Sequence, residues 1–276
     1  GYCNDISAIH DWREYDSVVS SGEQITAGLM AIALQKQGIH ARSWLGWQLP
    51  IQTNDLYGNA KIEEIDTAGL LASLSDGQVA VVPGFQGVTP ENRITSLGRG
   101  GSDTTAVALA AALRADRCDI YTDVDGIYTT DPRIVPQASK LSQVYYEEML
   151  ELSSLGAKVL HTRSVETAMK NDTPLQVLSS LDEAVGSDLP GTLVTEEEHI
   201  MNKKSVSGVA YSRDEAKISL LGIEDIPGIL AKVFAPLAKE GVNVDMIVQN
   251  VSANGKTIDL TFTVPRKDLQ RSINTL

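Results

Sequence analysis

The stretch GRGGSD at residues 98–103 is followed by an alanine-rich run and then by YTDVDGIYTTDPR at residues 121–133. Glycines let the backbone approach a ligand closely, and the amides at a helix N-terminus attract anions. The alanine-rich run predicts a helix over 104–115, and residues 118–122 predict a buried strand. That strand ends in hydroxyls, carboxylates and an arginine. Two anion-binding features on one strand–helix–strand unit predict phosphate binding and phosphoryl transfer.

The surrounding sequence alternates between helical and strand patterns, and residues 1–15 show no clear periodicity. Such alternation predicts an α/β fold with a mostly parallel sheet between layers of helices. The run at 79–83 is continuously apolar, which predicts a strand that is buried on both faces. The other expected helices are 24–38, 70–74, 147–155 and 158–169, and the other expected strands are 41–45 and 175–179.

A second domain follows a change in composition at residues 183–204, where glycine, proline and an acidic run predict a connection. We therefore expect domains at 1–195 and 205–276. The second domain has the order of a ferredoxin-like βαββα unit without its last strand. Both ends of the chain suggest a fragment of something longer. The expected elements are strand 217–222, turn 225–228, helix 229–240, strand 244–251, turn 253–255, strand 257–264 and a helix from 267.

Composition excludes several classes of function. The chain has 276 residues and a net charge of −13, which opposes binding to nucleic acid or to an acidic membrane surface. Its longest apolar stretch, residues 106–113, is too short to span a bilayer. Two cysteines without a disulfide pattern, and no signal peptide, predict a cytoplasmic protein with neither nucleic-acid nor membrane partners.

Four ordered motifs together resemble the aspartate kinases of the amino-acid kinase superfamily. They are Ser21-Gly22-Glu23, Gly84-Phe85-Gln86-Gly87, the stretch from 98 to 133, and Gly156-Ala157-Lys158-Val159-Leu160-His161. The Asp-x-Pro-Gly turn at 225–228 marks an ACT domain of the kind joined to these kinases. The resemblance implies transfer of the ATP γ-phosphoryl group to the β-carboxylate of L-aspartate, giving 4-phospho-L-aspartate. It also implies feedback control by lysine, threonine or both.

The resemblance assigns one group of residues to the amino-acid substrate. Glu23 would hold the α-ammonium group, and Arg99 would clamp a carboxylate bidentately, which a lysine would do less well. Asp103 would orient groups in the reaction region, and Phe85 would form a wall of the pocket. The implied catalytic residues are Arg99, Asp103 and Glu23, and the implied substrate-binding residues are Glu23, Phe85, Arg99, Gly100, Gly101 and Ser102.

A second group is assigned to ATP, and Mg²⁺ would be held mainly by the ATP phosphates and water. Arg99 and Lys158 are expected to converge on one triphosphate pocket. Judged without the resemblance, Thr130-Asp131-Pro132 also fits an ordinary turn, and Lys158 also fits a solvent-exposed lysine on a helix. The implied nucleotide-binding residues are Thr122, Asp123, Tyr128, Thr129, Thr130, Asp131, Pro132, Arg133 and Lys158.

The ACT domain is expected to bind an amino-acid effector at a helix N-terminus, with Asp225 holding the ammonium group. Because ACT units pair through their sheets, we expect a homodimer, or a heterotetramer with a shorter subunit. The four histidines show no metal-binding spacing and are expected to be structural or to lie on the surface. The implied effector-binding residues are Asp225, Ile226, Pro227, Gly228, Ile229, Leu230, Asn243, Val244, Asp245 and Gln249.

One departure from the family pattern leaves alternatives open. The aspartate kinases begin with a Lys-Phe-Gly-Gly-Thr strand and turn, and nothing in residues 1–30 matches it. Loss of that lysine predicts a chain that turns over poorly or not at all. A non-catalytic, amino-acid-binding regulatory subunit is the alternative, although Glu23, Arg99 and Lys158 argue against it. A third interpretation keeps the kinase and exchanges aspartate for another small acid.

Overall fold

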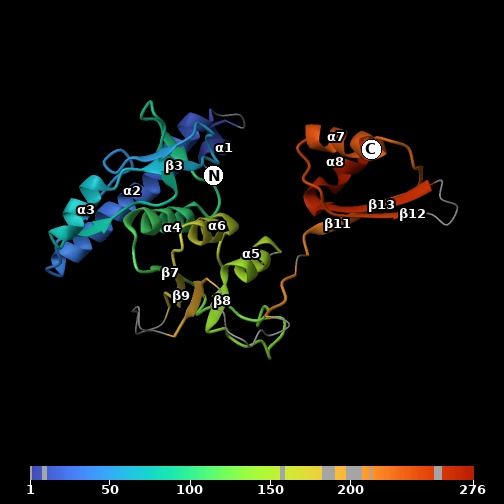
Figure 1. Ribbon diagram of the computed structural model, residues 1–276. Coiled ribbons are helices and arrows are strands. Elements are labelled where there is room, and N and C mark those ends of the chain that lie inside the picture. Colours follow the sequence, from blue (N-terminus) through green and yellow to red (C-terminus); the bar gives the residue numbers. More distant parts are fainter. Residues whose placement is uncertain are drawn as a thin grey trace. The chain divides into compact units, whose positions relative to one another are not determined.

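The computed structural model describes residues 2–7, 11–155, 159–181, 190–196, 207–211, 213–251 and 257–276. The chain divides into two compact units, Gly1–Ala210 and Tyr211–Leu276 (Figure 1). Each unit has its own buried hydrophobic residues. Most of the predicted connection at 183–204 and the predicted turn at 253–255 lie outside the described residues.

The first unit combines helices with short strands, which confirms the α/β class expected from the sequence (Figure 1). Its helices are α1 (Tyr2–Ile6), α2 (Trp12–Lys36), α3 (Ala68–Ser75), α4 (Gly101–Leu113), α5 (Tyr146–Ser154) and α6 (Thr162–Lys170). Its strands are β1 (Ala41–Ser43), β2 (Ile51–Thr53), β3 (Ile62–Ile65), β4 (Val79–Val81), β5 (Gln86–Val88), β6 (Ile94–Ser96), β7 (Cys118–Thr122), β8 (Gln143–Tyr145), β9 (Leu175–Ser179) and β10 (Thr192–Thr195).

The strands of this unit pair as three sheets rather than as one mostly parallel sheet. The orders are β1-β4, β3-β2-β5-β6 and β7-β9-β10-β8. Parallel pairs join β1 to β4, β2 to β5, β7 to β9 and β8 to β10. Antiparallel pairs join β2 to β3, β5 to β6 and β9 to β10. The sheets are therefore mixed, because the strands at 51–65 and 86–96 run as antiparallel neighbours that the sequence pattern did not predict.

Helix α2 begins at Trp12, so two expectations for this region were wrong: a helix starting at 24 and a lack of periodicity before 15. The Asp11 side chain caps the helix by accepting a hydrogen bond from the Arg13 amide at 2.9 Å. Glu23 consequently lies in the middle of a 25-residue helix rather than at its start.

Two further expectations need correction. Strand β4 is not buried on both faces, since Val79 is 41% exposed and, among the described residues, β4 pairs only with β1. Helix α6 begins at Thr162 instead of 158, with His161 as its N-cap. In the core beside it, α4, α5 and α6 pack with β7 and β9 around Val107, Met149 and Val177.

The second unit has the βαββα order expected of an ACT domain. It contains β11 (Glu215–Glu224), α7 (Ile229–Lys239), β12 (Asp245–Val251), β13 (Thr257–Pro265), the short 3₁₀ turn Arg266–Asp268 and α8 (Leu269–Thr275). The sheet order is β11-β13-β12, with antiparallel pairing throughout. Leu237, Leu260 and Phe262 are fully buried between α7 and the sheet.

Candidate active site

The glycine loop, residues 97–103, joins β6 to α4. Gly98 and Gly100 both have left-handed backbone conformations, with φ angles of +72° and +70°. Gly100 is the N-cap of α4, and a Cβ atom at this position would lie 2.3 Å from Cγ of His161. Glycine is therefore required at residue 100 by the backbone conformation and by the neighbouring ring.

A second helix begins at the same place. His161 is the N-cap of α6, and its Nδ1 accepts a hydrogen bond from the Arg163 amide at 3.4 Å. Helices α4 and α6 pack against each other (Figure 1). The contact between Gly100 and His161 brings both N-termini together, and each N-terminus carries partial positive charge. This junction is suited to binding an anion.

Arg163 holds the backbone of the glycine loop. Its Nη2 donates a hydrogen bond to the carbonyl oxygen of Leu97 and another, at 3.3 Å, to the carbonyl oxygen of Arg99. Because both carbonyl oxygens accept hydrogen bonds from a side chain of α6, this helix stabilises the backbone conformation of the glycine loop. The side chain of Arg99 itself is exposed.

Asp103 and His161 lie close enough for each to affect the pKa of the other. Burial raises the pKa of Asp103, although the nearby His161 ring, the His161 amide and the Ser102 side chain act in the opposite direction. Burial and then the Arg163 guanidinium lower the pKa of His161, against a smaller effect of Asp103. The lowered pKa favours the neutral form of the histidine, so the arginines and the helix ends supply the positive charge at the junction.

Phe85 packs its backbone against the glycine loop. Its φ angle is +71°, a strained conformation for a residue with a bulky side chain. Its amide donates to Oγ1 of Thr105 at 3.1 Å, and its carbonyl oxygen accepts from the Leu97 amide at 2.8 Å. A Cβ atom on Gly101 would lie 2.9 Å from the Phe85 ring. The strained turn and the start of α4 thus form one packed unit.

Helix α2 is joined to the Phe85 turn through a buried glutamine. Oε1 of Gln86 accepts from Nε2 of Gln24 at 2.9 Å, and Nε2 of Gln86 donates to the Ser20 carbonyl oxygen at 3.3 Å. Glu23 is exposed and directly precedes Gln24. The structure therefore brings the predicted substrate residues of α2, the Phe85 turn and the glycine loop into one region.

The predicted nucleotide residues follow the end of β7. Oγ1 of Thr122 donates to the Asp123 carboxylate at 3.2 Å. Farther along, Asp125 accepts a hydrogen bond from the Tyr128 hydroxyl at 3.1 Å and lies 3.2 Å from Nζ of Lys140. Burial acts to raise the pKa of Asp125, but hydrogen bonds from Lys140 and Tyr128 outweigh it and lower that pKa. The Tyr128 side chain is thus held by a carboxylate that the sequence analysis did not select.

The TDPR segment forms a local turn. Asp131 accepts from the Arg133 amide at 2.9 Å and pairs with the Arg133 guanidinium at 2.8 Å, while its carbonyl oxygen accepts from the amides of Ile134 and Val135. This geometry matches the alternative interpretation of Thr130-Asp131-Pro132 as a turn. Lys158 lies outside the described residues, so its expected convergence with Arg99 stays a prediction.

Two of the predicted effector residues, Asp225 and Asp245, lie at opposite ends of the ACT sheet. The turn at 225–228 follows Glu224, which pairs with Thr257, whereas Asp245 pairs with Thr263 at the other end of β13. At about 3.3 Å per residue, some 20 Å of sheet separates them. One ACT unit therefore cannot bring Asp225 and Asp245 to the same small ligand.

Sequence reasoning missed three residues that shape this region: Asp16, His161 and Arg163. Asp16 is fully buried and accepts hydrogen bonds from Gly58 and Ser96. His161 was expected to be structural, and it does cap a helix, but its ring also packs on the glycine loop. The available signal was its position at the end of the Gly-Ala-Lys-Val-Leu-His motif, directly before a helix.

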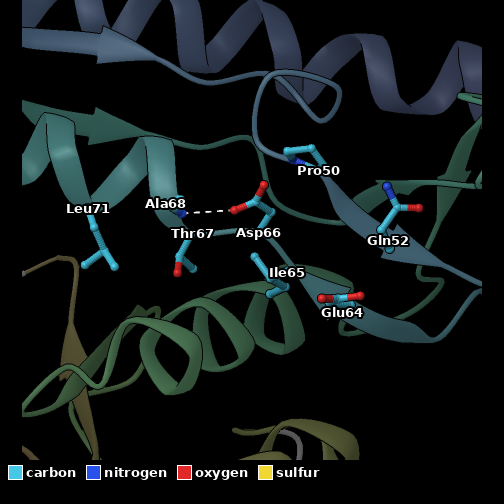
Figure 2. A pocket seen from close by; sticks show the side chains of 8 residues that line it. All are labelled: Pro50, Gln52, Glu64, Ile65, Asp66, Thr67, Ala68 and Leu71. Carbon is cyan, nitrogen blue, oxygen red and sulfur yellow. Dashed lines mark hydrogen bonds between the residues drawn. The ribbon is translucent and has the colours of Figure 1, made fainter.

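The hollows in the surface of the first unit include a larger and a smaller pocket, and the smaller one bears on the candidate site. The larger, of about 590 Å³, contains no predicted site residue; Figure 2 shows Asp66 accepting from the Ala68 amide at its rim. The smaller, of about 430 Å³, includes Gly84 and Ser102 of the candidate site. The larger pocket is lined by Pro50, Gln52, Glu64, Ile65, Asp66, Thr67, Ala68 and Leu71.

Comparison with known proteins identifies this arrangement. The sequence model of the amino acid kinase family matches residues 4–179, which include α2, the glycine loop and the α6 junction. The chain belongs to the amino acid kinase family. An ACT domain model matches residues 218–276. The junction of the glycine loop with α4 and α6 lies within residues 4–179, the part of the chain that the family model matches.

Named relatives are aspartate kinases. The chain is 51% identical to the aspartate kinase of Pseudomonas putida over 96% of its own length and 63% of the relative's. It is 45% identical to the aspartokinase of Geobacillus stearothermophilus over the same shares. It thus spans less than two thirds of the length of these relatives.

A solved structure supports the same relationship. The fold resembles that of Escherichia coli aspartokinase III in complex with aspartate and ADP, with a TM-score of 0.76 and 34% identity. The match covers 92% of this chain and 56% of the other. Among the described residues, none of the helices combines the length and hydropathy needed to cross a bilayer.

Proposed function

We propose that the protein is an aspartate kinase, which transfers the γ-phosphoryl group of ATP to the β-carboxylate of L-aspartate and forms 4-phospho-L-aspartate. The observation that carries this proposal is the meeting of two helix N-termini at Gly100 and His161, beside the exposed Arg99. Phosphoryl transfer depends on positioning and on positive charge around the migrating group, and this junction offers both. The names of the relatives favour aspartate as the acceptor.

For the amino acid, we propose that the two ends of the substrate bind to different elements. The Glu23 carboxylate on α2 would pair with the α-ammonium group. Arg99 and the amides of Gly100, Gly101 and Ser102 would hold carboxylate oxygens. Phe85, fixed by its backbone contacts to the loop, would form a wall.

For the nucleotide, Thr122, Asp123 and Tyr128–Arg133 would contact ATP, and Lys158 would reach the phosphates. The donor set fits Mg²⁺ held by phosphate and water. Among the described residues, no three His, Cys, Asp or Glu side chains gather as a metal cage, and Mg²⁺ commonly uses only one or two carboxylates. Asp103 and Asp123 are the carboxylates that we propose as candidate ligands of Mg²⁺.

Calorimetry with L-aspartate and MgATP tests the proposal directly. We expect both to bind to this chain, with L-aspartate binding weakened at least tenfold in Glu23→Gln. A matched control is Glu63→Gln on β3, an acidic residue outside the predicted site. A folded wild-type sample that binds neither ligand would contradict the assignment. Binding of nucleotide without aspartate would redirect the search to another acid acceptor, tested in a coupled ADP assay.

We further propose that residues 205–276 form an ACT regulatory domain, and residues 1–195 the kinase domain, with lysine or threonine as effector. Because Asp225 and Asp245 lie at opposite ends of the sheet, the effector site would form between two ACT units. Strand β12 offers an exposed edge for such pairing, with Met246 67% and Val251 62% exposed. We expect a homodimer, or a heterotetramer with a shorter subunit.

Sedimentation with and without each amino acid tests this second proposal. We expect lysine or threonine to favour the dimer, and Asp225→Asn to remove the response. A protein that stays monomeric in the presence of either amino acid would contradict it.

We also propose a cytoplasmic location, which suits an ATP-dependent enzyme whose Cys3 and Cys118 are free thiols.

A further inference from the structure

Asp16 is an unusual residue for the interior of this unit. It is 0% exposed and lies on α2. Burying a carboxylate is costly unless donors surround it. None of the ion pairs in the described part of the chain includes Asp16, and among those residues its burial is compensated by hydrogen bonds.

The donors to Asp16 come from the two segments that enclose the glycine loop. Oδ2 accepts from the Ser96 amide at 2.8 Å and from the Gly58 amide at 2.9 Å, and Oδ1 accepts from the Ser96 hydroxyl at 2.6 Å. Ser96 is the last residue of β6 and directly precedes the loop. A Cβ atom on Gly98 would lie 2.9 Å from the Gly58 carbonyl oxygen, so Gly58 packs on the loop itself.

The same helix carries Glu23, seven residues after Asp16. Seven residues of α-helix advance about 10 Å and complete nearly two turns, so both side chains leave α2 on nearly the same side. Ser20, which lies between them, and Gln24, which directly follows Glu23, attach the helix to Gln86 beside Phe85. Helix α2 is therefore fixed to the glycine loop at one point and to the Phe85 turn at another.

We infer that Asp16 is a positioning residue, which sets the separation between Glu23 and the glycine loop so that both ends of one amino-acid substrate bind together. This inference rests on the proposed function. A carboxylate suits the role because its two oxygens accept three hydrogen bonds from rigid backbone and a short side chain. An asparagine would keep one oxygen for the two amides, but its NH₂ group would force the Ser96 hydroxyl to accept instead of donate, and the hydrogen bonds would lose the charge of the carboxylate.

The test compares Asp16→Asn with Thr95→Val. Thr95 is one residue from Ser96, and its hydroxyl forms a buried hydrogen bond with Thr53 at 2.6 Å. Thr95→Val therefore removes a buried polar contact in the same strand without touching the loop. We expect both variants to lower Tm. Only Asp16→Asn should weaken L-aspartate binding, by about tenfold, while MgATP binding is unchanged.

Two further measurements separate positioning from simple stabilisation. Amide hydrogen exchange of residues 97–103 should be faster in Asp16→Asn and unchanged in Thr95→Val. In a double-mutant cycle, Asp16→Asn and Glu23→Gln should have non-additive effects on L-aspartate affinity. Additive effects, or a lower Tm with unchanged loop exchange and aspartate affinity, would overturn the inference. If the wild type bound neither ligand, the proposed function would fail, and loop exchange alone would decide the role of Asp16.

Discussion

The guanidinium of Arg163 donates a hydrogen bond to the backbone carbonyl oxygen of Arg99, 3.3 Å away. A residue in the first turn of α6 thereby holds the middle of the loop that begins α4. Because the contact is to backbone, the Arg99 side chain stays available to a ligand.

Arg163→Ala should release the loop from the α6 side. We expect L-aspartate to bind about tenfold more weakly and MgATP with unchanged affinity, because two backbone carbonyl oxygens of the loop that would hold the substrate carboxylate lose a charged donor. Calorimetry on both ligands checks this. Arg271→Ala, which removes an exposed ion pair with Glu240 in the ACT unit, is the control and should leave both affinities unchanged. Equal losses in the two variants would contradict a role for Arg163 at the loop.

Gly100→Ala should both destabilise the protein and weaken ligand binding. The new Cβ atom would overlap the His161 ring in a backbone conformation that alanine disfavours, at a cost of about 1–3 kcal/mol or more. Gly38→Ala measures the loss of stability that comes from the backbone conformation alone. Gly38 also has a positive φ angle, +78°, but no atom lies within 4 Å of the added carbon. Urea denaturation of both variants measures the difference. Equal losses of stability would show that the His161 contact is unimportant.

Asp103→Asn should stabilise the fold in a pH-dependent way. The folded pKa of Asp103 lies above its unfolded value of 3.8, so the folded state binds more protons through that window. Asp103 therefore contributes less stability as the pH rises from 3.8 through its folded pKa. The Tm of Asp103→Asn relative to wild type, measured by calorimetry, should increase as the pH rises from 3.8 through the folded pKa of Asp103. A constant difference would mean that Asp103 titrates as it does in the unfolded chain.

Cys118 should resist alkylation in the folded protein. It is 7% exposed, and burial raises the pKa of its thiol to about 11, so thiolate is scarce at pH 8. Iodoacetamide at pH 8, followed by mass spectrometry, should modify Cys3 and leave Cys118 unmodified until denaturant is added. Rapid labelling of Cys118 in native buffer would show that β7 opens readily.

The sequence predicted best where chemistry and local propensity agree. The glycine loop leading into α4, the strand at 118–122 and the order of elements in the ACT unit depend on short-range signals, and the structure contains each of them. The start of α2 was missed because residues 12–23 are mostly polar and include Gly22, so their helical pattern is weak. Packing against β1 and β6 stabilises that helix, and such tertiary contacts leave no local signal.

The parts of the candidate site that depend on long-range contacts were harder to predict. Asp16 lies 80 residues from Ser96 in the chain, and Arg163 lies 64 residues from Arg99. Neither Asp16 nor Arg163 belongs to a sequence motif from whose spacing its hydrogen-bond partner could be predicted. The left-handed backbone of Phe85 was also unexpected, because glycine is the usual residue in that conformation and Gly84 precedes it.

The seven-residue interval on α2 between Asp16 and Glu23 restricts how this stretch of the gene can change in length. Each inserted or deleted residue would turn every later side chain by about 100° around the helix axis. With Asp16 fixed to its three donors, a single-codon insertion at residue 18 would point Glu23 away from the loop, even though no residue of the site had been replaced. Point substitutions in this interval are therefore far easier to accommodate than indels.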